Sequence, residues 1–152
     1  MNIQDELKIV ARLQAYVMAK TKIREAAEAI TQDLQRENGL PIPEIILATC
    51  DPLGANKNWS IFFKQKNNNF FEPIKDERLP FVFQKAAKEV YDVTGKPLSE
   101  VVLAKNKIKD YGWFVSLRAG SKPLPMSEHC YVPNIKKFIF LKNEEYMLKE
   151  AA

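Results

Sequence analysis

The chain has 152 residues, of which 46% are hydrophobic and 28% are charged, and its formal net charge is +4. Such a composition is ordinary for a folded globular domain and excludes a disordered chain, and the length predicts a single domain over residues 1–152. No apolar run approaches the roughly 18–20 residues needed to cross a bilayer, and Asp5, Glu6, Lys8 and Arg12 interrupt the first residues, so we expect neither a membrane span nor a signal peptide.

The first predicted element is a long helix over residues 3–37, which Asn38-Gly39 terminates. Apolar residues recur in it at alternating spacings of four and three, with one polar interruption at Lys20. At 1.5 Å per residue the helix is about 50 Å long, whereas a compact domain of this size is about 30 Å across. We therefore expect a break near Lys20-Thr21-Lys22 or a helix that lies across a sheet. The alternative is a projecting helix that pairs with a second copy to form a homodimer. The apolar positions are Ile9, Leu13, Tyr16, Ile23, Ala27, Ile30 and Leu34.

Strand patterns come next along the chain. The continuous apolar run over 44–49 indicates a buried strand, and residues 59–66 alternate between two faces. Pro73 confines a short strand over 70–74 to the edge of the sheet. These segments predict a hairpin with a short edge strand beside it.

The second half of the chain predicts another helix and more strands. An apolar stripe runs through residues 78–94, and Gly95 ends that helix. Residues 120–128 read as a loop, because Pro123 and Pro125 interrupt any regular pattern. The remaining predictions are strands over 100–105, 111–118 and 135–141 and a short helix over 143–152.

This order of elements predicts an α+β fold. We expect a two-layer sandwich in which a mostly antiparallel sheet of about five strands carries the long N-terminal helix and the second helix on one face. The sheet then has a second face, on which aromatic and cationic side chains gather. The residues we expect to make contacts with a partner are Trp59, Phe62, Lys64, Phe114, Arg118, Phe138 and Phe140.

Charge supports a binding role. Residues 96–142 carry nine Lys or Arg and three Asp or Glu, a field that attracts anionic partners. We expect a non-catalytic, cytoplasmic protein-binding module of inhibitor, immunity or chaperone type, whose protein partner has an acidic or mixed surface. The order of elements resembles that of small secretion-chaperone folds and of bacterial toxin–immunity binders, a likeness of fold that does not itself imply a function. The alternative for the same face is single-stranded nucleic acid, since bases stack on aromatics while cations neutralise phosphates.

A third hypothesis is a hydrolase or transferase that depends on Cys50. The chain's single histidine, His129, would act as base for this thiol, and Asp51 or Glu128 would orient the imidazole. The simpler interpretation is that Cys50 is a small buried hydrophobe. Two cysteines and one histidine make a poor metal site, and the scattered glycines form no phosphate-binding loop, so we expect neither a metal nor another cofactor.

Overall fold

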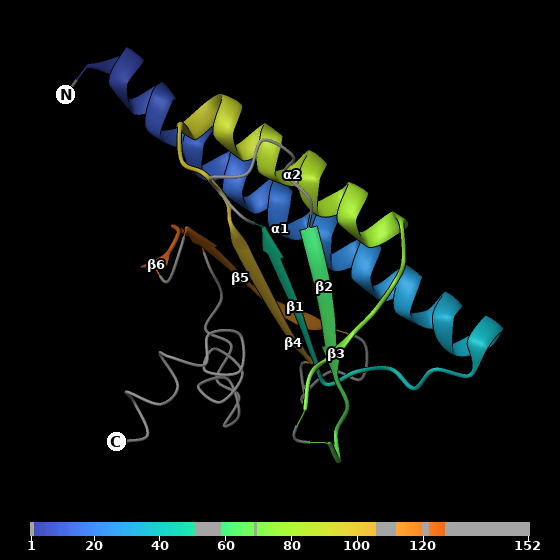
Figure 1. Ribbon diagram of the computed structural model, residues 1–152. Coiled ribbons are helices and arrows are strands. Elements are labelled where there is room, and N and C mark those ends of the chain that lie inside the picture. The colour runs from blue at the N-terminus through green and yellow to red at the C-terminus, as the bar shows by residue number, and fades with distance from the viewer. Residues whose placement is uncertain (1, 51–58, 69, 106–111, 120–121, 127–152) are drawn as a thin grey trace, which may run out of the picture.

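The computed structural model describes residues 2–50, 59–68, 70–105, 112–119 and 122–126. Two helices and a six-stranded antiparallel sheet make up this part of the chain (Figure 1). The α+β prediction is confirmed, with six strands in place of about five. The elements are α1 (Ile3–Asn38), β1 (Ile45–Cys50), β2 (Trp59–Lys64), β3 (Glu72–Pro73), α2 (Arg78–Thr94), β4 (Glu100–Lys105), β5 (Trp113–Ala119) and β6 (Lys122–Pro123).

The sheet has the strand order β3-β2-β1-β4-β5-β6. β1 lies at its centre and pairs with β2 and β4, and every pairing among these strands is antiparallel. The sixth strand, β6, falls within 120–128, where the sequence predicted a loop. Because β6 has two residues, its pairing leaves no sequence pattern to detect. The strand predicted over 135–141 and the helix predicted over 143–152 lie outside the described residues.

Both helices cover one face of the sheet, α1 over β5 and α2 over β2 (Figure 1). They pack against each other there and enclose the main hydrophobic core. Trp59 illustrates the fit, since its ring stacks on Phe83 of α2 with centroids 5.7 Å apart and its indole N–H donates to Gln84 at 3.1 Å. Within the described residues, neither helix combines the length and the apolarity that a membrane crossing requires.

Of the two arrangements expected for α1, the break near Lys20 is wrong, because the helix runs unbroken for 36 residues, and the helix instead lies across the sheet. The Thr21 hydroxyl donates to the Val17 carbonyl at 3.0 Å, so it supports the turn that precedes it and does not cap a new segment. Next to it, Lys22 forms an ion pair with Glu89 of α2 at 2.9 Å. At 1.5 Å per residue α1 is about 54 Å long. It lies across the sheet with its C-terminal part and extends beyond the sheet with its N-terminal part (Figure 1).

Candidate functional site

The sheet face opposite the helices, called here the outer sheet face, was the predicted contact surface. The pairing of the strands brings Phe62, Leu47, Val102 and Ser116 into one row across it. Its centre is excluded from solvent, because Ile45, Leu47 and Val102 are each at most 1% exposed. The aromatic residues Phe62 and Phe71 are half-buried against them. The middle of this face is therefore buried apolar surface, and what stays accessible lies at its margins.

Lys64 is the most buried of the predicted contact residues. Its side chain is 1% exposed and forms an ion pair with Glu44, Nζ to Oε2, at 3.1 Å. The same ammonium donates to the Gln65 carbonyl at 3.3 Å. A buried ammonium must be paired and hydrogen-bonded to be tolerated. Lys64 thus has a structural role inside the sheet, between the end of β2 and the residue that precedes β1.

Four of the five predicted contact residues that are described lie on the outer sheet face, and Trp59 does not. The strand register places Lys64 and Phe114 in one row across that face. Trp59 is buried on the helix side, opposite to Phe62, because neighbouring positions along a strand alternate in direction. Phe114 and Arg118 are half-buried on β5, and the Arg118 guanidinium donates to Ser116 at 3.2 Å. Phe138 and Phe140 lie outside the described residues. The basic-aromatic contact surface therefore stays a prediction, of which four described residues share the outer sheet face in buried or half-buried positions.

Cys50 ends β1 and is half-buried. It lines a hollow of about 320 Å³ between the end of the sheet and α2, together with Trp59, Gln84, Lys88, Tyr91 and Leu98. The proposed base His129 and the orienting residues Asp51 and Glu128 lie outside the described residues. The hollow therefore supplies a cavity next to a thiol, and the dyad hypothesis gains no geometric support from the part that is described.

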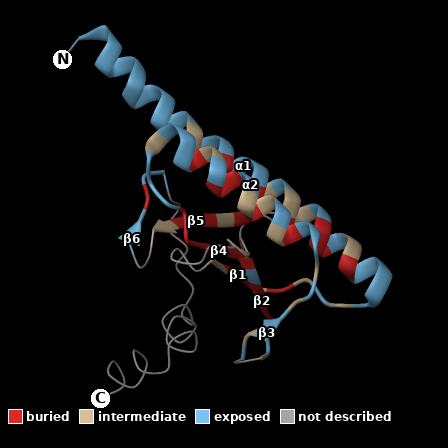
Figure 2. Ribbon diagram, turned by 45° about the horizontal axis from the view of Figure 1, so that its top comes forward, coloured by how far each residue is buried: buried red, intermediate tan, exposed pale blue. Residues whose placement is uncertain are grey.

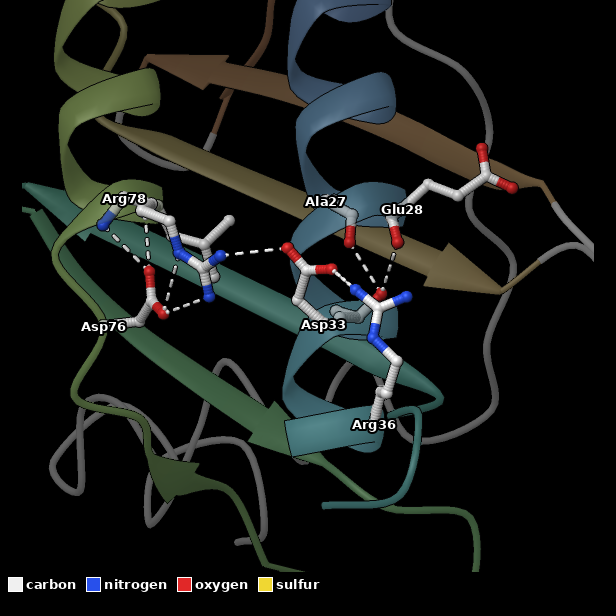
Figure 3. Close-up of polar contacts among 8 residues, drawn as sticks. Ala27, Glu28, Asp33, Arg36, Asp76 and Arg78 are labelled. Atoms are coloured by element: carbon white, nitrogen blue, oxygen red, sulfur yellow. Dashed lines mark hydrogen bonds and ion pairs between the residues drawn. The ribbon is translucent and has the colours of Figure 1, made fainter. Parts of the chain in front are cut away.

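A charged cluster joins the end of α1 to the start of α2 (Figure 3). Arg78 donates to Asp33 of α1 at 3.0 Å and to Asp76 at 3.0 Å, and Arg36 pairs with Asp33 on its other side. Asp76 also accepts the backbone N–H groups of Arg78 and Leu79 at 2.8 and 3.2 Å, so it caps α2. Both carboxylates of this cluster are engaged by cations, which makes it a clamp between the two helices.

The pKa of Asp76 reflects this position. Burial acts most strongly and raises it, but the hydrogen bonds from the Arg78 side chain and from the backbone N–H groups of Leu79 and Arg78 together outweigh burial. The pKa of the carboxyl therefore lies below its usual value of 3.8. The apolar stripe predicted the start of α2 at residue 78, but Asp76 was not predicted as its cap, although an Asp just before a helix is a standard capping signal.

Seven of the twelve exposed large hydrophobic residues among the described residues lie on α1. Its buried residues begin at Tyr16, and residues 3–14 are all exposed (Figure 2). Six large side chains, called here the α1 stripe, are between 38% and 74% exposed. Isolated exposed apolar residues are normal, but a contiguous set indicates a binding surface. The α1 stripe consists of Ile3, Leu7, Val10, Leu13, Val17 and Met18.

The α1 stripe was not predicted from the sequence, because the apolar face of this helix was assigned to a different seam. The seam through Tyr16, Ile23 and Leu34 is indeed buried, whereas its first positions, Ile9 and Leu13, lie beyond the sheet and are exposed. Ile3, Leu7, Val10 and Val17 follow a second course around the same helix, offset from that seam. The sequence signal for this second course is the spacing of four, three and seven residues between these four positions.

No family model matches this chain, and neither a curated protein nor a solved structure matches it. Within the described ranges, no group of three or more His, Cys, Asp or Glu residues is arranged to hold a metal ion. The function therefore has to follow from the chain's own geometry.

Proposed function

We propose that this protein is a non-catalytic protein-binding module and that it binds through the α1 stripe. The observation that carries the proposal is the exposure of six large apolar side chains on the N-terminal half of α1, four of which precede its first buried residue, Tyr16. Binding surfaces of this kind combine a projecting amphipathic helix with an apolar face on the partner. The outer sheet face is a weaker candidate, because its central aliphatic residues are already excluded from solvent.

The proposed partner is a protein surface, and nucleic acid is not favoured. Lys64 is buried in an ion pair, and Arg118 is half-buried beside Ser116, so neither offers an open cation next to an exposed aromatic. The α1 stripe itself presents aliphatic and thioether side chains, on which bases do not stack. We further propose a reducing, cytoplasmic setting, since two cysteines are too few for a disulfide framework.

Affinity purification from the native cell extract tests the proposal. The bait is the tagged protein, compared with Leu7→Glu, which places a charge in the α1 stripe. The matched control is Phe81→Glu, which makes the same kind of change at an exposed apolar residue of α2. We expect proteins retained by the unsubstituted bait, including untagged copies of this chain, to be lost with Leu7→Glu and kept with Phe81→Glu. Retention that is the same for all three baits would refute the assignment of the surface.

A further inference from the structure

The α1 stripe has a spacing that is complementary to itself. We propose that two copies of this chain associate by antiparallel pairing of the N-terminal halves of α1; this names the occupant of the α1 stripe and rests on the proposed function. A line of positions spaced alternately by four and three residues runs from Ile3 to Thr21; four of its six positions are apolar, and Gln14 and Thr21 are polar. This spacing is the repeat of a two-stranded coiled coil. Exposure along this line continues to Thr21, so the sheet and α2 leave it accessible.

An antiparallel pair has a two-fold axis close to residue 12. Around this axis Leu7 of one copy meets the apolar Val17 of the other, while the two remaining layers each pair an apolar residue with a polar one, and each layer occurs twice. On one side of the seam, Leu13 lies beside Leu13 of the second copy. On the other side, Met18 covers the contact. The layers are Ile3 with Thr21, Leu7 with Val17, and Val10 with Gln14. The contact is isologous and closes after two copies, as in most homodimers.

The charged residues that flank the seam also favour the antiparallel register. In an antiparallel coiled coil, a position that flanks the seam on one helix faces the same heptad position on the other helix. Glu6 of one copy therefore lies beside Lys20 of the second copy, and this pair occurs twice. In a parallel pair, Glu6 lies beside Ala11 and this attraction is lost. Flanking charges of opposite sign decide partner and orientation more than they decide affinity.

The shape of the molecule favours the antiparallel arrangement as well. The sheet and α2 lie along the C-terminal part of α1, and the N-terminal part is bare (Figures 1 and 2). Antiparallel pairing places the two sheets at opposite ends of the helix pair. Parallel pairing places both sheets beside the same end, where they compete for space.

Sedimentation equilibrium of the purified chain at micromolar concentrations tests the pairing. One chain has a mass of 17.5 kDa, and we expect the unsubstituted protein and Phe81→Glu to have twice that mass. Leu7→Glu and Val17→Lys, each alone, place charges opposite apolar side chains and should return the mass of a single chain. Mixing these two variants sets the new carboxylate opposite the new ammonium, and we expect the doubled mass to return. Far-UV circular dichroism of each variant confirms that α1 is folded.

The outcomes separate this inference from the proposed function. A single-chain mass for the unsubstituted protein, or a doubled mass that survives Leu7→Glu, overturns the pairing. If the unsubstituted protein has the doubled mass but the mixture of Leu7→Glu and Val17→Lys keeps the mass of a single chain, the antiparallel register is wrong. Residues 7 and 17 of the two copies would then not meet. If the chain is a single copy in solution while Leu7→Glu still abolishes capture of another protein, the pairing fails and the proposed function remains.

Discussion

Lys64 shows how one residue can have a binding-type sequence pattern and a structural role. In the sequence it follows two phenylalanines on an alternating strand, a pattern typical of a cationic rim beside an aromatic surface. In the fold it is 1% exposed and reaches Glu44, which precedes β1 in the chain. The alternation along the strand predicts the face on which Lys64 lies. The burial of its side chain depends on Glu44, Gln65 and the neighbouring strands. The identity of an ion-pair partner is a property of the tertiary structure.

Lys64→Met tests this structural role. Methionine keeps most of the side-chain length but leaves Glu44, which is 18% exposed, without its ammonium partner. Removing one member of a buried pair is costly, and the partial exposure of Glu44 reduces the penalty, so we expect a loss of about 2 kcal/mol in the free energy of unfolding. Urea denaturation measures it. Lys66→Met is the matched control at an exposed position, where the change should stay within about 0.5 kcal/mol. Equal stability of the two variants contradicts the role.

The lowered pKa of Asp76 links the cap of α2 to pH. A carboxyl whose pKa is lower in the folded than in the unfolded chain stabilises the fold above the unfolded value, here 3.8, and this contribution disappears as pH falls through the folded value. We expect Asp76→Ala to lose about 1 kcal/mol at pH 7 through the missing cap. The difference from the unsubstituted protein should shrink on acidification towards pH 3.

Urea denaturation at pH 7, 5 and 3 measures this dependence. Glu77→Ala is the control, since Glu77 is exposed and its side chain makes no capping hydrogen bond. A difference between Asp76→Ala and the unsubstituted protein that is the same at all three pH values would show that the carboxylate charge is not what stabilises α2.

At the scale of elements, the helices and the central strands were predictable. α2 has its predicted bounds because a continuous apolar stripe ends at Gly95, whose φ of +72° suits a residue without a Cβ. β4 also agrees with its predicted range, since three consecutive branched or aliphatic residues leave no alternative. The end of α1 was signalled by Gly39 in the same way as that of α2.

What could not be predicted depends on contacts between elements. The break near Lys20 was inferred from the length of α1 compared with a compact domain, but a helix longer than the body it packs on can extend beyond it. Lys22 forms an ion pair with Glu89, a residue 67 positions away, and Thr21 bonds within its own helix. Likewise, the two-residue strand β6 exists because β5 offers it an edge, whereas the edge strand predicted over 70–74 is present as β3 beside β2. The α1 stripe was visible in the sequence, but its exposure follows from where the sheet ends.

At the scale of the whole molecule, the domain buries the centre of its sheet on both faces but leaves apolar side chains exposed on the N-terminal part of α1. Two copies that cover this surface for each other stabilise the folded state by mass action, because the unfolded chain has no such contact. Between a concentration near the dissociation constant and one a hundredfold higher, the stabilisation is about 1.5 kcal/mol per chain. For about 150 residues this corresponds to a rise in Tm of roughly 3–6 °C.

Differential scanning calorimetry over that concentration range measures the effect. The unsubstituted protein and Phe81→Glu should show the rise, and Leu7→Glu should melt at one temperature throughout, because its charge lies in the α1 stripe. At the lowest concentration, where about half of the chains are paired and pairing stabilises each chain by only about 0.4 kcal/mol, Leu7→Glu and the unsubstituted protein should melt within about 2 °C of each other, since an exposed substitution in a helix changes the folded monomer little. If Leu7→Glu melts far lower there, Leu7 supports the fold of the single chain, and the stabilisation cannot be assigned to a contact between copies.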